Sequence, residues 1–200
     1  MDVQFNEERH EYSVNGKILK SVTQIMEALG ITWFPENAKR DYYLLRGGYV
    51  HEAIRLINHG VLDDESVDDA IKGYVEAYHK FVKEVSFRPE MIEYRSANLA
   101  SGYAGTLDCV GELAGTRVLV DFKSGGVNEK SVRLQTAAYM LMDGISGISA
   151  RYGLSLKADG TYRLSKAYTE HSKDKNNWLA AVVAYSLQTV RIKEGKVVQA

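Results

Sequence analysis

The stretch GTLDCVGELAGTRVLVDFKSG, residues 105–125, contains two runs of strand-forming residues separated by Ala114 and Gly115. Aliphatic and β-branched side chains recur through both runs, and a short Ala-Gly loop suits a tight hairpin turn. Each run also contains one aspartate, Asp108 in the first and Asp121 in the second. Aspartate is uncommon inside strands, so two of them in one hairpin need a chemical reason.

Pairing the two strands across that loop predicts a single register. It places Glu112 opposite Arg117 and Val110 opposite Leu119, so that a charge pair and an apolar pair both form. Continued away from the turn, the same register predicts the following positions: Asp108 opposite Asp121, Thr106 opposite Lys123, and Leu107, Cys109 and Phe122 together on the other face.

Two carboxylates at directly opposite positions would repel each other. A hard divalent cation such as Mg²⁺ or Mn²⁺ would neutralise them, because these ions take oxygen ligands. Lys123 follows Asp121 by two residues and therefore shares its face, while Phe122 turns into the core. The pattern predicts a metal site with an ammonium group beside it, which is suited to activating water. The competing interpretation is a solvated strand end that carries ordinary surface charges.

Composition narrows the possible classes of protein. The length of 200 residues suits one domain, 1–200, with a core of its own. The one cysteine, Cys109, excludes an intrachain disulfide, a cysteine-based zinc site and a self-contained iron-sulfur cluster. A formal net charge of −1 argues against coating nucleic acid through bulk charge. The sequence has no apolar run of membrane-spanning length and no signal-peptide pattern, so a cytoplasmic protein without a membrane partner is expected.

Local patterns predict the order of helices and strands. The elements expected are an N-terminal β-hairpin, a helix from a Ser21-Gln24 capping box to about Gly30, a helix from about Pro35 to Asn58 that could kink at Gly47-Gly48, a helix over 64–84, strands over about 90–123, a helix over about 129–143, a hairpin turned at Asp159-Gly160, and a last helix from near Asp174. This order favours an α/β domain in which helices flank a central mixed β-sheet.

Four motifs together resemble those of the PD-(D/E)XK nuclease superfamily, in particular its RecB-like branch and related phage exonucleases. GTLD at 105–108 resembles the Gly-x-x-Asp of that branch, and VDFKSG at 120–125 resembles its hydrophobic-Asp-x-Lys strand. QTAAYML at 135–141 is similar to its Gln-x-x-x-Tyr helix, and RGGYVHEAI at 46–54 to its Gly-x-x-x-His helix. The proline that usually precedes the first aspartate is missing before Asp108. The resemblance implies a restriction-endonuclease-like core.

The resemblance also implies a role for each matching residue. Asp108 and Asp121 would be catalytic metal ligands, joined by the side chain of His51 and the backbone carbonyl of Phe122. Lys123 would orient or activate the attacking water. The remaining implied site residues are Gln135 and Tyr139, which would lie beside the DNA backbone and the lysine, and Glu93, an extra carboxylate near the metal.

The implied activity is that of a Mg²⁺- or Mn²⁺-dependent deoxyribonuclease. We expect an exonuclease of phage or prophage recombination or DNA processing, which hydrolyses phosphodiesters with a metal-activated water in a bacterial or phage-infected bacterial cell. Its partners would be DNA, contacted mainly at phosphates, and a single-strand annealing or other recombination protein. Three alternatives stay open: a structure-specific or nicking endonuclease on the same core, a non-catalytic DNA-binding module, and a hydrolase of a small phosphate ester.

Overall fold

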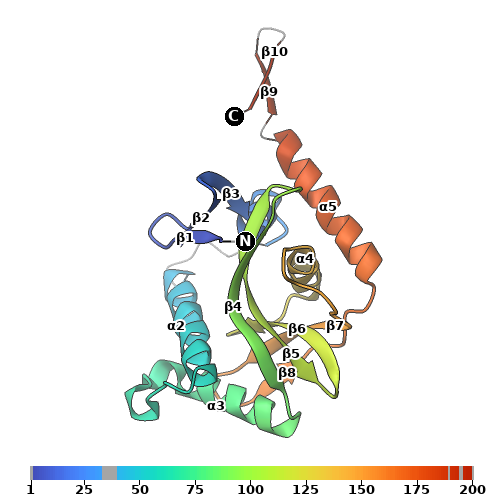
Figure 1. Cartoon of the computed structure of the whole chain (residues 1–200). Coiled ribbons are helices and arrows are strands. Elements are labelled where there is room, and N and C mark those ends of the chain that lie inside the picture. The colour runs from blue at the N-terminus through green and yellow to red at the C-terminus, as the bar shows by residue number, and fades with distance from the viewer. Residues whose placement is uncertain (1, 33–39, 189, 194–195, 200) are drawn as a thin grey trace.

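The structure, a computed structural model, describes residues 2–32, 40–188, 190–193 and 196–199. In these residues an open, mixed sheet of eight strands is flanked by helices, so the expected α/β arrangement is confirmed (Figure 1). The strands are β1 (Gln4–Asn6), β2 (Glu11–Val14), β3 (Lys17–Ser21), β4 (Arg88–Asn98), β5 (Tyr103–Leu113), β6 (Thr116–Lys123), β7 (Ala150–Leu156) and β8 (Tyr162–Leu164). The helices are α1 (Val22–Ala28), α2 (Arg40–Asn58), the 3₁₀ turn η1 (Asp64–Ser66), α3 (Asp69–Glu84), α4 (Glu129–Tyr139) and α5 (His171–Gln188). A separate hairpin of β9 (Val190–Lys193) and β10 (Lys196–Gln199) follows α5.

Strand β5 is the centre of the sheet, because three strands pair with it. β4 runs antiparallel along one edge for the length of the strand. The other edge is divided: β3 pairs in parallel with Tyr103 and Ala104, whereas β6 pairs antiparallel with residues 109–113. Residues 105–108 lie between these two pairings and have no strand partner on that edge. The sheet therefore opens beside Asp108.

The β5–β6 hairpin has the register predicted from the sequence near its turn. Glu112 pairs with Arg117 and Val110 with Leu119. Ala114 and Gly115 both have positive φ, 50° and 75°, which is the backbone that a two-residue hairpin turn of the twisted type requires. The regular pairing ends at Cys109 and Val120, one residue before the two aspartates.

Two apolar clusters lie on opposite faces of the sheet. On one face α2 and α3 pack against β6, with Ile54, Tyr78 and Phe122 completely buried. On the other face α1, α4 and α5 surround Leu119 and Trp178, which are also completely buried. Figure 1 shows α2 and α3 on one side of the sheet and α4 and α5 on the other. The strand β6 therefore alternates between two cores, as its near-continuous apolar sequence indicates.

The predicted alternation fails in one place that matters for the site. Leu107 packs in the cluster with α4, whereas Cys109 packs in the cluster with α2. Side chains two apart on a regular strand share a face, so β5 changes face at Asp108. Glu93 lies beside it on β4 with a φ of 47°, a left-handed conformation that is rare for glutamate. The prediction that Leu107 and Cys109 share a face is wrong because this paired irregularity interrupts both strands.

The remaining elements follow the sequence with small differences. Ser21 and Gln24 form the predicted capping box, and the turn at Asp159-Gly160 connects β7 and β8. α2 runs without a break through Gly47-Gly48, while the predicted start near Pro35 lies outside the described residues. α4 ends four residues earlier than predicted, and α5 begins three residues earlier.

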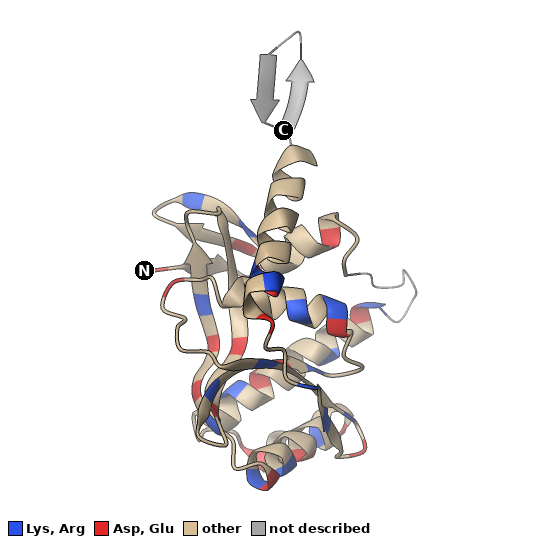
Figure 2. Cartoon of the chain, turned by 90° about the vertical axis from the view of Figure 1, so that its right-hand side faces the viewer, with Lys and Arg blue, Asp and Glu red and all other residues tan. Residues whose placement is uncertain are grey.

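Charged residues of both signs are interspersed over the molecule (Figure 2). This distribution agrees with the formal net charge of −1. None of the helices in the described part of the chain combines the length and the apolar character needed to cross a bilayer.

Candidate metal and catalytic site

A cleft of about 210 Å³ lies where the edge of β5 opens. Strands β5 and β6 and helices α2 and α4 contribute one part of its wall, and β2, β3 and α1 contribute the rest. Its lining residues are His10, Tyr12, Ser21, Val22, Thr23, His51, Gly105, Thr106, Asp108, Lys123, Gln135 and Tyr139. The cleft thus brings together five residues that the sequence motifs had selected, His51, Asp108, Lys123, Gln135 and Tyr139, which are spread over 89 positions of the chain.

Three potential metal ligands meet at one end of this cleft. His51 Nδ1 lies 3.0 Å from Oε1 of Glu93 and 3.6 Å from Oδ1 of Asp108. One ligand atom from each residue falls within 4.8 Å of the other two. α2 provides His51, while Glu93 and Asp108 come from the positions where β4 and β5 change face. The strand irregularity is therefore what turns both carboxylates toward the histidine.

The charges around His51 favour its protonated, positively charged form. Burial alone would lower the pKa of His51, but the carboxylates of Asp108 and Glu93 outweigh it and raise the pKa to about 9. Burial raises the pKa of Asp108, against the opposing influence of His51 and Lys123. The imidazolium holds together two carboxylates that would otherwise repel each other.

Asp121 lies next to this group and is completely buried. Lys123 Nζ is 2.6 Å from its Oδ2, whereas its Oδ1 has no hydrogen-bond partner among the described residues. Burial raises the pKa of Asp121 to about 6, the ammonium of Lys123 lowers it, and the nearby charge of Asp108 adds to the increase. A buried carboxylate oxygen without a partner is costly, so Oδ1 of Asp121 is a candidate metal ligand.

Lys123 connects the aspartates to helix α4. Its Nζ lies 3.5 Å from Oε1 of Gln135, and Nε2 of Gln135 donates to the hydroxyl of Tyr139 at 2.9 Å. Gln135 and Tyr139 are four residues apart on α4, so they project from one face of the helix. Burial would lower the pKa of Lys123, but Asp121 and Asp108 raise it, so the amine stays charged. This chain of contacts fixes the direction of the ammonium.

Asp108 makes a further contact with the backbone of the neighbouring strand. Its Oδ2 accepts a hydrogen bond of 2.5 Å from the N–H of Phe122, just past the last regular pair, Cys109 and Val120. This bond fixes Asp108 to β6 beside Asp121, and the two aspartates do not form a regular strand pair. The ring of Phe122 is buried in the core, as predicted, and the role of its carbonyl as a ligand stays a prediction.

Part of the cleft was not identified from the sequence. The Tyr12 hydroxyl lies 2.9 Å from Oγ1 of Thr106, which closes one side of the opening. His10, with a φ of 50°, lies on the same wall. These residues reach the site because β3 pairs with β5, 83 residues later in the chain. No local pattern in the sequence encodes that pairing.

The chemistry of this donor set fits a divalent cation that prefers oxygen with some nitrogen. It offers the carboxylates of Glu93 and Asp108, the imidazole of His51 and the unpartnered Oδ1 of Asp121. No model of a protein family matches this chain, and no curated protein matches it significantly.

Proposed function

We propose that this protein is a Mg²⁺- or Mn²⁺-dependent deoxyribonuclease with a PD-(D/E)XK-type, restriction-endonuclease-like core. One observation carries the proposal: Lys123, which pairs with buried Asp121, lines the same cleft as His51 and Asp108, with which Glu93 converges. An acidic cluster alone would indicate only a cation site. An ammonium directed at the acidic cluster, and held by a glutamine and a tyrosine, adds a group that can act on water or phosphate.

His51, Glu93, Asp108 and Asp121 would hold the cation, with the carbonyl of Phe122 as a further candidate. When bound, the cation would supply Lewis-acid activation of the phosphate and stabilise negative charge in the transition state. It would also replace the positive charge that the protonated His51 supplies between two carboxylates.

The side chains of the cleft have complementary roles in this proposal. Lys123 hydrogen-bonds and orients a water molecule, whose oxygen attacks phosphorus while the water releases one proton to the solvent. Gln135 and Tyr139 keep the ammonium directed into the cleft. The P–O bond to the leaving nucleoside breaks, and that oxygen takes a proton, so that the products are a phosphate monoester and an alcohol.

The proposed substrate is DNA, and an exonuclease of recombination or DNA processing is the form we favour. Contacts to phosphates would make cleavage weakly dependent on sequence. A single-strand annealing or other recombination protein is the partner such an exonuclease would serve.

The test is incubation of purified protein with linear and with closed-circular DNA, in Mg²⁺, in Mn²⁺ and in EDTA. We expect metal-dependent loss of linear DNA and persistence of the circles. Cutting of circles would indicate the endonuclease alternative. The Asp121→Asn variant, purified in parallel, controls for contaminating nucleases. Absence of cleavage of either DNA by the wild type in both metals would contradict the proposal.

A further inference from the structure

The N-terminal half of α2 has an unusual concentration of exposed aromatic rings. Tyr42, Tyr43 and Tyr49 are 53%, 44% and 57% exposed. No other Tyr, Phe or Trp in the described part of the chain is as exposed, and the neighbouring Leu44 and Leu45 are exposed as well. Tyr42, Leu45 and Tyr49 line one groove, and grouped exposed apolar side chains mark a binding site more often than isolated ones do.

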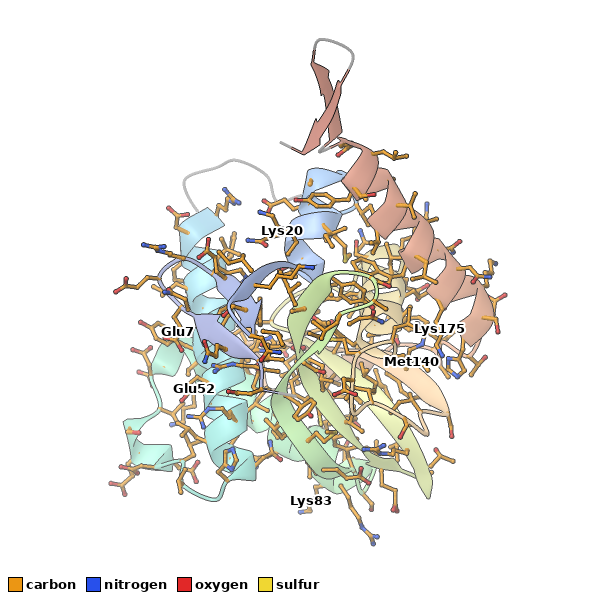
Figure 3. All side chains as sticks on the ribbon, turned by 45° about the horizontal axis from the view of Figure 1, so that its top comes forward. Glu7, Lys20, Glu52, Lys83, Met140 and Lys175 are labelled. Carbon is orange, nitrogen blue, oxygen red and sulfur yellow. The ribbon has the colours of Figure 1, made fainter. Side chains whose placement is uncertain are left out.

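Part of this surface forms a groove of about 420 Å³ between α2 and the segment that leads into α3. Tyr42 and Tyr49 are seven residues apart, so they stand two turns apart on one face of α2. Figure 3 marks this region with Glu52, which comes from α2 and lines the groove. The principal lining residues are Tyr42, Leu45, Arg46, Tyr49, Val67 and Ile71. The groove therefore offers flat π-faces and an apolar floor.

Arg46 connects the groove to the candidate catalytic cleft. Its Nη2 donates a hydrogen bond of 2.7 Å to the carbonyl of Ser124, the residue after Lys123. Its guanidinium carbon also lies 5.0 to 5.8 Å from the ring centroids of three tyrosines, Tyr42, Tyr43 and Tyr74. A positive charge thus lies among the rings, at the end of the strand that carries the catalytic lysine.

The acidic residues at the groove are already engaged. Glu52 makes two hydrogen bonds to Arg55, of 2.8 and 2.6 Å, and Asp68 caps the N-terminus of α3 through the N–H of Ala70. Arg46 is therefore the charge in the groove that is available to an anionic ligand.

Gly48 provides a second, independent observation. It lies in the interior of α2 with ordinary helical backbone, and a Cβ added to it would have no atom within 4 Å. No packing contact in the described structure therefore requires glycine there, although glycine weakens a helix. Gly48 is exposed and precedes His51 by three residues, so it lies within one turn of a residue that lines the cleft. A bare helical surface allows another backbone to approach closely.

We infer that the groove binds an unpaired base of the DNA strand whose phosphates occupy the cleft, so that the preferred substrate is single-stranded or frayed DNA. This inference rests on the proposed nuclease function. The rings of Tyr42 and Tyr49 stack on the base, and Arg46 offsets the charge of the adjoining phosphates. The sugar-phosphate chain crosses α2 over Gly48. A base in a closed duplex presents no free face to the rings, so paired DNA makes fewer of these contacts.

Fluorescence anisotropy with a labelled oligothymidylate and with a blunt duplex of the same length tests the inference. Measurements are made in EDTA, so that no cleavage occurs. We expect the wild type to bind the single strand more tightly than the duplex. Tyr42→Ala and Tyr49→Ala should each weaken single-strand binding about fivefold or more and change duplex binding little, because stacking on an aromatic ring contributes on this scale.

Matched variants separate stacking from other effects. Tyr42→Phe and Tyr49→Phe keep the ring and should keep the affinity. Leu187→Ala removes a side chain of α5 that is 67% exposed, and should change nothing. Gly48→Leu should weaken single-strand binding, and Gly48→Ala less so, while neither lowers the melting temperature, because both residues form helices better than glycine does.

Several results would overturn the inference. They are a wild type that binds duplex at least as tightly as single strand, alanine variants with unchanged single-strand affinity, and equal losses for single strand and duplex. If the patch binds another protein instead, the alanine variants would keep the wild-type affinity for single-stranded DNA. The outcome is separable from the proposed function. If DNA binding depends on the tyrosine rings but no DNA is cleaved, only the nuclease proposal is contradicted. If DNA is cleaved but binding does not depend on the rings, only the inference about the groove is contradicted.

Discussion

Lys123 holds its Nζ 2.6 Å from Oδ2 of Asp121, and this ion pair brings a charged amine into the cleft that Asp108 also lines. Asp121 is completely buried, but about a third of the Lys123 side chain is exposed. The carboxylate is fixed while the ammonium faces the cleft, so the pair has one structural and one accessible partner.

Lys123→Ala should separate chemistry from metal binding. We expect single-turnover cleavage of pre-bound DNA to slow by a factor on the order of 10² or more, because the charged donor that orients the attacking water is lost. Mn²⁺ should still raise the melting temperature of the variant, since the ammonium is not a ligand. Lys130→Ala, which removes an exposed lysine of α4, is the control. A cleavage rate near that of the wild type for Lys123→Ala would refute the proposed role.

Asp121→Asn should abolish cleavage without weakening the fold. In EDTA we expect a melting temperature equal to or above that of the wild type, because the change removes a buried charge whose Oδ1 has no partner. The gain should be on the order of 1 kcal/mol in the free energy of unfolding. A large loss of stability in EDTA would show that Asp121 instead holds the fold together.

Millimolar Mn²⁺ should stabilise the wild type, because only the folded chain brings the candidate ligands together. A concentration about 100 times the dissociation constant would add about 2.7 kcal/mol to the free energy of unfolding. His51→Ala and Glu93→Gln should each reduce the increase in melting temperature. His79→Ala, an exposed histidine of α3, should leave it unchanged. If Mn²⁺ and EDTA give the wild type the same melting temperature, the metal site is absent.

Asp174 should make the fold sensitive to acid. Burial alone would raise its pKa, but hydrogen bonds from Arg151 and Arg133 hold the pKa below its ordinary value. A depressed pKa contributes stability above the unfolded value of about 3.9, and that contribution disappears as pH falls through the folded value. Asp174→Asn should cost about 3–5 kcal/mol at pH 7, because Arg151 has no exposed surface and loses its charge partner.

Urea unfolding between pH 3 and pH 7 measures this effect. The difference in stability between wild type and Asp174→Asn should begin to shrink near pH 4, where Asp174 becomes protonated in the unfolded chain, and should go on falling toward the lower pKa of the folded protein. Asp64→Asn is the control, because Asp64 is exposed on the 3₁₀ turn η1. A stability difference that does not change with pH would mean that the carboxylate charge of Asp174 is not what matters.

The parts of this molecule that could be predicted from the sequence are those whose partners are close in the chain. The register of Glu112 with Arg117 follows from a two-residue loop, and the Ser21-Gln24 capping box from a spacing of three. The layers of the fold follow from the periodicity of apolar residues. Such features need only local geometry.

The features that could not be predicted from the sequence depend on contacts between distant segments of the chain. The left-handed backbone at Glu93 and the change of face at Asp108 are set jointly by β4 and β5, so neither strand shows them alone. The burial of Arg151 against Asp174 needs β7 and α5 to meet. A periodic pattern also cannot say which exposed residues gather at one place, as Tyr42 and Tyr49 do beside α3.

The divided edge of β5 also has a consequence for the order of folding. The β5–β6 hairpin can close within microseconds because its strands adjoin in sequence, but His51 must find Glu93 across 42 residues, and β3 must find β5 across more than 80. We therefore expect the ligand cluster to assemble late, after the transition state. Mn²⁺ should accordingly slow unfolding and leave the refolding rate unchanged, as stopped-flow fluorescence can measure. A chain still being synthesised would carry His51 out of the ribosome long before α4 follows, and would have no working site until that helix had docked.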